Sequence, residues 1–274
     1  LRRVRIVLAA LAVLLAVVLV RADKPWEGRV GARLAAGEKL SVPQSIQVGL
    51  YGGAAADLLV VLALLGTAVW WMRRPSAADF PPVPPPPGLK RGVALALAAA
   101  CLLAAGFRIP LASRSLWWDE IWNLRKAVVG ERVAPDPAAA VGTPQVFTPV
   151  DWSRTFFHYS KPTNHIPFSV ASRISLSIWR KLTGAPPGSF HEFWFRFPNL
   201  LASVMAVAVL GVLLAEWRHP RAGVAAAFLL ALHPWHIRYG VDGRAFSFLL
   251  LLGLLGCLAL TRALRTGRWR PWIG

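Results

Sequence analysis

The sequence Ser115-Leu116-Trp117-Trp118-Asp119-Glu120 follows directly on a predominantly apolar run, residues 93–111, and this join decides the fold. A run of that length can cross the hydrocarbon core of a bilayer as a helix, and tryptophans are enriched where such helices leave the lipid. The carboxylates of Asp119 and Glu120 therefore meet water at the membrane surface, a place suited to chemistry on a lipid-borne substrate. The alternative is an ordinary helix N-terminus, capped by Ser115 and carrying acids in its first turn.

The composition favours a membrane protein. Of 274 residues, 55% are hydrophobic and only 16% are charged, and the apolar residues gather in runs too long for a soluble core. The formal net charge of +18 would suggest nucleic acid in a soluble protein. Here the basic residues flank the apolar runs, which is the pattern that orients membrane helices. We therefore expect an all-α polytopic membrane protein with membrane lipid as its surroundings and no nucleic-acid partner.

Residues 1–74 are expected to form two N-terminal membrane helices joined by an outer loop. Their apolar runs are residues 4–20, which also resemble a signal sequence, and residues 48–72. Asp57 lies within the second run. We expect it to be a buried, hydrogen-bonded structural acid, and a proton relay is the alternative.

Residues 75–92 form a linker that contains Pro81-Pro82-Val83-Pro84-Pro85-Pro86-Pro87. Consecutive prolines exclude helix and favour extended polyproline II, so we expect a stiff cytoplasmic spacer and the main domain boundary here. Residues 93–274 then form the membrane core. Its long outer loop, residues 112–196, follows the first span of that core.

The run at residues 166–182 determines the topology of everything after it. Serines, arginines and a lysine interrupt this run, which favours an amphipathic helix lying in the membrane interface over a span. With that helix flat, spans at residues 197–217, 222–239 and 246–264 place several basic tracts together on the cytoplasmic side. Those tracts are Arg73, Arg74, Lys90, Arg91, Arg218, Arg221, Arg262, Arg265, Arg268 and Arg270.

The same topology brings four polar clusters to one outer surface. They are Asp119 with Glu120, residues 161–165, Arg196, and Asp242 with Arg244. A helix crossing at residues 166–182 would instead separate the first cluster from the last by a bilayer. The flat arrangement is therefore the one that assembles a site.

The order of motifs resembles the lipid-linked-sugar glycosyltransferases of the GT-C superfamily. Trp118-Asp119-Glu120 is similar to the acidic pair that opens that family's first large outer loop, and Asn164-His165-Ile166-Pro167 to the Asn-His-x-Pro element that closes it. Arg196-Phe197-Pro198-Asn199 stands where the family has Arg-Leu-Pro-Ser. His233-Pro234 and then residues 239–246, Tyr-Gly-Val-Asp-Gly-Arg-Ala-Phe, stand where it has Ser-Pro and Tyr-Ser-x-Glu-Ala-Arg-x-Tyr.

The resemblance covers roughly residues 95–265 and is greatest to the bacterial branch related to protein O-mannosyltransferases and aminoarabinose transferases, glycosyltransferase family 39. Two departures stand out, because Asp242 replaces the usual Glu and Gly243 the usual Ala. The two spans before Val93 lie outside the family's common core, and its further helices would follow Gly274. We therefore expect this chain to be an N-terminal portion of such an enzyme.

The resemblance implies a GT-C-like fold with juxtamembrane helices in the outer loop, in a multi-pass protein of the bacterial inner (plasma) membrane. It implies transfer of a sugar from a polyprenyl-phosphate donor to a lipid, glycan or protein acceptor at the outer face, with inversion. Asp119 would be the general base, and Glu120 would orient the acceptor or support Asp119. The substrate-binding residues so implied are Lys161, Asn164, His165, Arg196, Asp242, Arg244, Trp117 and Trp118.

Several of these residues have plainer interpretations. Arg244, Lys161 and His165 would contact phosphate, but His165 also suits the satisfaction of loop backbone groups. Arg196 is equally typical of a side chain that snorkels at the mouth of a span. Trp117 and Trp118 could stack on a sugar ring or could anchor the chain at the interface.

No metal site or cofactor is predicted with certainty. His233 and His236 lack a third ligand at suitable spacing, although some members of the superfamily use a divalent cation, and the sequence leaves both cases open. Cys101 and Cys257 lie inside expected spans and are interpreted as core residues. A transporter or a non-enzymatic membrane protein is the competing class, but the chain lacks the internal hydropathy repeat expected of a transporter.

Overall fold

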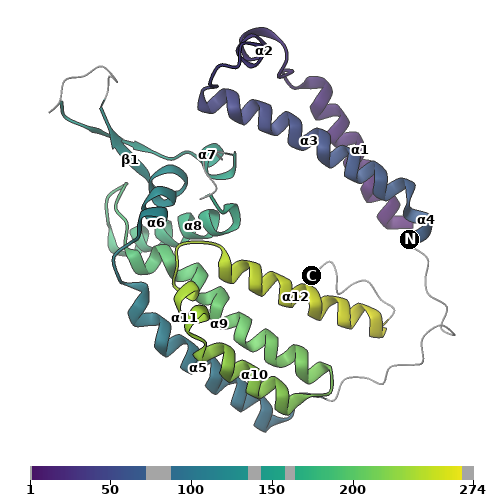
Figure 1. Ribbon diagram of the computed structural model, residues 1–274, viewed down its shortest axis with the longest axis vertical. Coiled ribbons are helices and arrows are strands. Elements are labelled where there is room, and N and C mark those ends of the chain that lie inside the picture. Colours follow the sequence, from purple (N-terminus) through teal and green to yellow (C-terminus); the bar gives the residue numbers. More distant parts are fainter. Residues whose placement is uncertain (1, 72–87, 135–142, 158–163, 267–274) are drawn as a thin grey trace. The chain divides into compact units, whose positions relative to one another are not determined.

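The computed structural model describes residues 2–71, 88–134, 143–157 and 164–266. The contacts divide the chain into two compact units, Leu1–Pro81 and Pro82–Gly274 (Figure 1). Five of the described helices are long and apolar enough to cross a membrane. The chain is therefore an all-α polytopic membrane protein. The prolines at residues 81–87, expected to form a stiff spacer, lie outside the described residues.

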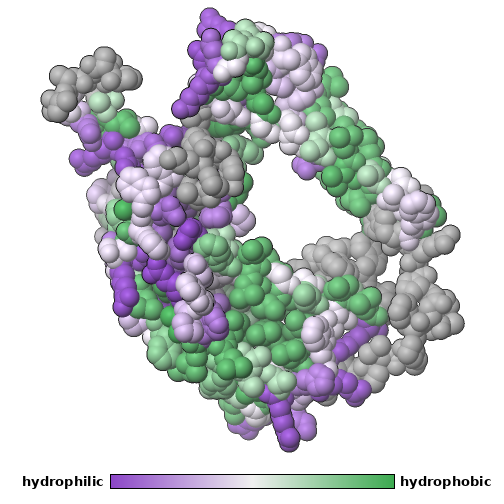
Figure 2. Space-filling model, in the orientation of Figure 1, coloured by the Kyte–Doolittle hydropathy of each residue, from purple (hydrophilic) through white to green (hydrophobic). Residues whose placement is uncertain are grey.

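The first unit is a helical hairpin. Helix α1 (Arg2–Arg21) packs against α3 (Val42–Gly66), and the short helices α2 (Gly28–Ala35) and α4 (Ala68–Trp71) lie at the two ends of α3 (Figure 1). Both long helices are strongly apolar, with mean hydropathies of 2.6 and 2.0 over their most apolar stretches, and apolar residues lie along the face of this unit seen in Figure 2. Their exposed faces are those of helices that meet lipid.

The expectation that Asp57 is buried is wrong. Its side chain is exposed on α3, because a hairpin partner can cover only one face of this helix. An added Cβ at Gly49, Gly52 or Gly53 would meet no atom within 4 Å. The glycine-bearing face of α3 is thus uncovered within this unit.

The second unit is a helix bundle with α9 (Glu192–Glu216) at its centre. Helices α5 (Arg91–Ala112), α10 (Pro220–Leu232) and α12 (Phe246–Thr266) all pack against α9. The core between α5, α9 and α10 is built largely of small residues, and an added Cβ at Gly211 would lie 2.2 Å from a Leu97 methyl carbon. Such residues allow backbones to approach closely, as is typical of membrane helices.

The span expected at residues 222–239 is not one helix. Helix α10 ends at Leu232, and a separate short helix, α11 (Pro234–Gly240), follows with Pro234 in its first turn. Proline has no N–H to bond and its ring clashes with the preceding turn, so it begins a helix but does not continue one. At 13 residues, α10 is about 20 Å long and alone falls short of a bilayer core of about 30 Å.

The outer-loop elements gather at the end of the bundle where α9 begins (Figure 1). They are α6 (Trp118–Asn123), the π-helix η1 (Leu124–Val128), β1 (Gly130–Val133), β2 (Val146–Pro149), α7 (Trp152–Phe157) and α8 (Ile166–Thr183). The antiparallel pair β1–β2 was not expected from the sequence. Figure 2 shows hydrophilic residues gathered over this end and apolar residues along the bundle helices.

Helix α8 lies against the start of α9 through its serines. Ser172 Oγ donates to the carbonyl of Phe195 at 2.8 Å, and Ser175 Oγ donates to the carbonyl of Trp194 at 2.7 Å. On its other side α8 exposes Ile174, Ile178 and Leu182. The helix is outside the set of five candidate spans, and its exposed apolar stripe suits an interfacial position.

Candidate functional site

A buried ion pair between Glu120 and Arg196 joins α6 to α9. The side chains are 0% and 5% exposed, respectively. Arg196 Nε donates to Glu120 Oε1 at 2.7 Å and Nη2 donates to Oε2 at 2.5 Å. Such a fork-to-fork contact fixes orientation as well as distance.

Arg196 uses all of its donors within the protein. Besides the two bonds to Glu120, Nη1 donates to the carbonyls of Ala112 and Arg114, and Nη2 donates to that of Ser115. A guanidinium has five N–H groups, so none remains for a phosphate. This arrangement supports neither the substrate-binding role expected of Arg196 nor the snorkelling alternative. It ties the end of α5 and the start of α6 to α9.

Glu120 is equally occupied. Its Oε2 accepts from the Trp117 backbone N–H at 2.9 Å, and its Oε1 accepts from the Gly243 backbone N–H. An added Cβ at Gly243 would lie 2.8 Å from Glu120 Oε1 and 2.4 Å from a ring carbon of Phe195. Glycine at this position therefore permits the close approach. Glu120 holds the 242–244 segment in place with both carboxylate oxygens already bonded, and it also lines the pocket described below.

Asp119, in contrast, faces solvent. Its side chain is 49% exposed, and its Oδ2 accepts from Arg244 Nη1 at 3.1 Å. Arg244 also pairs with Asp242, whose side chain is 1% exposed, through Nη2 and Oδ2 at 3.1 Å. The structure thus brings Asp119, Asp242 and Arg244 together, with the guanidinium between one accessible and one buried carboxylate.

Burial and charge set the titration of this group. Burial raises the pKa of Asp242, although the hydrogen bond and charge of Arg244 act in the opposite direction. Burial alone would lower the pKa of Arg244, but its hydrogen bond to Asp242 and the charges of Asp242 and Asp119 raise it. Arg244 is therefore a permanent cation.

His165 is a neutral group in this setting. It precedes α8, and burial followed by the charge of Arg244 lowers its pKa below the ordinary value of 6.5, with Asp242 opposing. Its ring lies 6.4 Å from that of Phe246. His165 can therefore exchange hydrogen bonds with a substrate at neutral pH, but it does not offer the positive charge that a phosphate would favour.

Asn164 stabilises the loop that precedes α8. Its side chain is buried, with Nδ2 donating to the carbonyl of Thr155 at 3.0 Å and Oδ1 accepting from Ser169 Oγ at 2.8 Å. These bonds hold the segment before α8 to the end of α7. A substrate contact for Asn164 is not supported by this arrangement. Lys161, also expected to bind phosphate, lies outside the described residues.

A pocket of about 350 Å³ opens beside the buried ion pair. Its apolar wall includes Leu111 and Leu116, and three arginines also line it: Arg196 of the ion pair, Arg114 and Arg238. The Arg238 guanidinium lies 4.3 Å from the ring centroid of Trp117, another lining residue. This combination suits a ligand with an apolar part and an anionic head.

Two of the three pocket arginines, Arg114 and Arg238, were not predicted from the sequence. Arg114 and Arg238 lie on the side of the bundle expected to face outward, where the positive-inside pattern predicts few basic residues. Basic residues on that side are an exception to the pattern, and this exception could have identified Arg114 and Arg238 from the sequence. Trp118 is not among the lining residues and is 68% exposed, which favours the anchoring alternative for it, whereas Trp117 is placed to contact a ligand.

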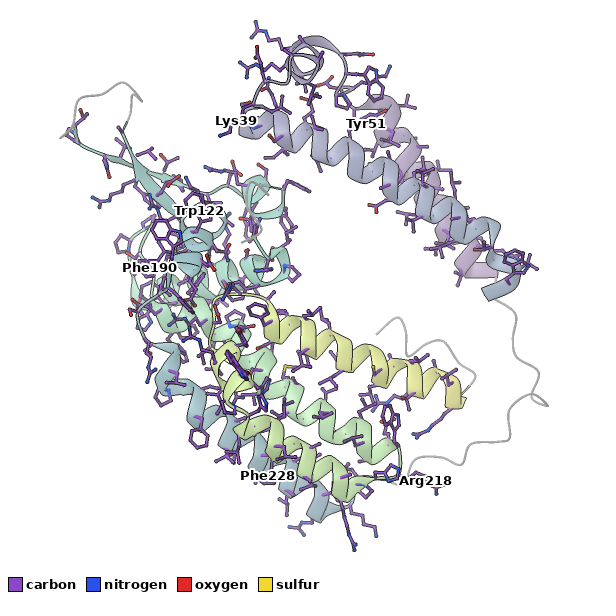
Figure 3. The ribbon with its side chains drawn as sticks, viewed as in Figure 1. Lys39, Tyr51, Trp122, Phe190, Arg218 and Phe228 are labelled. Atoms are coloured by element: carbon purple, nitrogen blue, oxygen red, sulfur yellow. The ribbon has the colours of Figure 1, made fainter. Side chains whose placement is uncertain are left out.

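Aromatic and charged side chains crowd this end of the second unit. Figure 3 shows Trp122 of α6 among them, with Arg218 at the opposite end of the bundle. There Glu216 pairs with Arg262 at 2.6 Å and with Arg265 at 3.5 Å, which joins the ends of α9 and α12. The candidate site and the group of Glu216, Arg262 and Arg265 thus occupy opposite ends of the second unit.

Within the described ranges, no group of three or more His, Cys, Asp and Glu residues could hold a metal ion. His233 is exposed at the break between α10 and α11, whereas His236 is buried. Comparison of this chain with protein-family models, with curated proteins and with solved structures finds no match.

Proposed function

We propose that this chain is a membrane glycosyltransferase, or the N-terminal portion of one, that uses a polyprenyl-phosphate sugar as donor. The observation that supports it best is the Asp119–Arg244–Asp242 group, a half-exposed carboxylate held by a fixed guanidinium beside a pocket with three further arginines. The site lies at the end of the bundle opposite to Arg218, Arg262 and Arg265. We infer an outer-face site in a bacterial inner membrane, with a lipid, glycan or protein as acceptor.

Asp119 is suited to the role of general base. Its carboxylate is accessible, and the bond from Arg244 fixes its orientation. The acceptor hydroxyl or amine attacks the anomeric carbon while Asp119 removes its proton. The bond from that carbon to the phosphate oxygen breaks, polyprenyl phosphate leaves, and the configuration at carbon inverts.

The pocket is suited to the donor. Arg114 and Arg238 can neutralise the charge that builds on the departing phosphate, as cations do in other group-transfer sites. Trp117 offers a ring face to the sugar, and Leu111 and Leu116 offer apolar contact to the first isoprene units. Arg244, bound to two carboxylates, acts chiefly by orienting Asp119.

The test distinguishes an enzyme from a transporter. Membranes containing the full-length gene product are supplied with polyprenyl-phosphate sugars, and the release of free polyprenyl phosphate is followed. We expect release that depends on an acceptor and is reduced in Arg238→Gln through a higher KM for the donor. Movement of the intact donor across the membrane without release would contradict the proposal.

A further inference from the structure

Arg108 is a cation enclosed in the bundle, and the proposed chemistry does not use it. It lies in α5, one turn before that helix ends, and is 0% exposed. Its recorded hydrogen bonds all go to uncharged acceptors: Ser203 Oγ at 2.7 Å, the carbonyls of Ala104 at 2.8 Å and Ala231 at 3.1 Å, and His236 Nδ1 at 2.8 Å. A charge at this depth is costly and requires a reason.

The end of α10 supplies part of the compensation. Helix α10 stops at Leu232 because Pro234 follows, so the carbonyl of Ala231 has lost the acceptor role that it would have in a continuous helix. The last carbonyls of a helix also carry partial negative charge. Arg108 Nη1 donates to this carbonyl. The bond satisfies a carbonyl that the break between α10 and α11 would otherwise leave without a partner.

Arg108 also contacts both ends of α11. The bond to His236 reaches the first turn, and Nδ1 must accept because a guanidinium only donates. The carbonyl of Leu230 lies 2.9 Å from the same nitrogen, so the other tautomer would bind α10 instead of Arg108. At the last residue of α11, an added Cβ on Gly240 would lie 2.8 Å from Arg108 Nε and 2.5 Å from Ser203 Oγ.

Helix α11 leads directly into the candidate site. Asn199 Nδ2 donates to the carbonyls of Tyr239 and Asp242 at 2.7 and 2.8 Å. The Gly243 N–H then binds Glu120, and Arg244 binds Asp119. A displacement of α11 would therefore be transmitted through two to four residues to the Asp242–Arg244 pair.

We propose that Arg108 is a positioning residue that closes the α10–α11 break and thereby sets Asp242 and Arg244 against Asp119. The proposal concerns structure first, and only its effect on transfer rests on the proposed function. It explains why a buried cation lies where a proline interrupts an apolar helix. Arg108 is not among the residues that line the pocket.

Hydrogen–deuterium exchange tests the proposal without any assay of activity. Arg108→Met removes the donors at similar side-chain length, and Arg91→Met is the matched control, on the same helix but exposed. In the purified full chain we expect the amide of Gly243, buried against Glu120, to exchange at least about tenfold faster in Arg108→Met, with the middle of α9 unchanged. Unchanged exchange at Gly243, or equal acceleration in every helix, would overturn the positioning role.

Two further variants keep the test decisive if Arg108→Met does not fold. His236→Phe removes the acceptor on α11 and should accelerate exchange at Gly243, whereas Arg108→Lys, which retains some donors, should lie between parent and Arg108→Met. In the transfer assay the same order should appear in kcat, with the KM for the donor nearly constant. Normal exchange at Gly243 in both His236→Phe and Arg108→Lys would refute the proposal, whereas altered exchange without transfer by the parent would refute only the enzymatic function.

Discussion

Asp119 and Glu120 are adjacent, but their environments differ completely. Successive residues of a helix point about 100° apart, so α6 directs Glu120 into the protein and Asp119 toward solvent, with side chains 0% and 49% exposed. The sequence presents them as a pair of acids. The structure separates them into one group that holds the site together and one that is available for chemistry.

The Glu120–Arg196 pair should dominate the stability of the second unit. Arg196→Met leaves Glu120 buried without its counterion, which typically costs about 3 to 5 kcal/mol. Arg125→Met, which removes a partly exposed pair with Glu131, should cost no more than about 1 kcal/mol. Thermal unfolding in detergent measures both. Equal midpoints for the two variants would contradict the structural role of Arg196.

The raised pKa of Asp242 predicts an unusual dependence on pH. Because burial raises its pKa above the ordinary 3.8, its protonated form stabilises the fold below the unfolded-state pKa, and this contribution is lost as pH rises through the folded-state pKa. Transfer, however, should be faster when Asp242 is ionised, because the ionised form holds Arg244. We expect the acid limb of the pH–rate profile to lie above the range of an ordinary aspartate, and in Asp242→Asn to move to lower pH. An identical limb in the variant would assign it to another group.

At the scale of elements, the break between α10 and α11 matters more than any span boundary. Apolar residues on both sides of Pro234 predicted a single crossing, yet the chain forms two helices there. The lengths of the other apolar runs were predictable because hydrophobicity follows directly from composition. The break depends on a distant group that satisfies the freed carbonyl of Ala231. That group is Arg108, which the sequence could not reveal because it lies 123 residues from Ala231.

The position of α8 yields a direct prediction of topology. With Cys101 and Cys257 replaced by alanine, a cysteine at Ser153 in α7 should react with an impermeant thiol reagent added outside the cell. A cysteine at His219, between α9 and α10, should react only after the membrane is opened, because α8 lies in the interface and α9 crosses inward. Both positions are exposed. Outside labelling of His219→Cys would show that α8 crosses and would separate Asp119 from Asp242.

The candidate site was predictable in part, because charged residues beside apolar runs stand out in the sequence. Acidic and basic residues beside apolar runs pointed to Asp119, Asp242 and Arg244, which the structure places in contact. The sequence could not assign Arg196 to Glu120, since the pair depends on α6 and α9 meeting across 76 residues. Arg108 stood as a cation inside an apolar run, a signal of function or pairing that only its partners could interpret.

At the scale of the molecule, the two units have different characters. The hairpin of the first unit presents apolar faces and carries Asp57 exposed on α3. The second unit has the Asp119–Arg244–Asp242 group at one end of the bundle, Glu216 with Arg262 and Arg265 at the other, and apolar residues along the helices between them (Figure 2). That polarity is what an enzyme acting on a lipid-linked substrate at a membrane surface requires, because tail and phosphate must lie in different surroundings.

The most direct test is the rate of sugar transfer by Asp119→Asn in the full-length gene product. Asparagine keeps the shape and can still accept from Arg244, but it cannot take a proton. Asp151→Asn is the matched control, because Asp151 accepts from the Arg154 N–H and from Ser153 Oγ at the start of α7, as a helix cap does. Both variants should insert and bind donor.

The account predicts that Asp119→Asn transfers sugar about a hundredfold to ten-thousandfold more slowly than the parent, while Asp151→Asn transfers at nearly the parental rate. A near-normal rate for Asp119→Asn, measured with donor binding intact, would contradict the assignment of Asp119 as general base. It would leave this carboxylate as an ordinary acid in the first turn of α6.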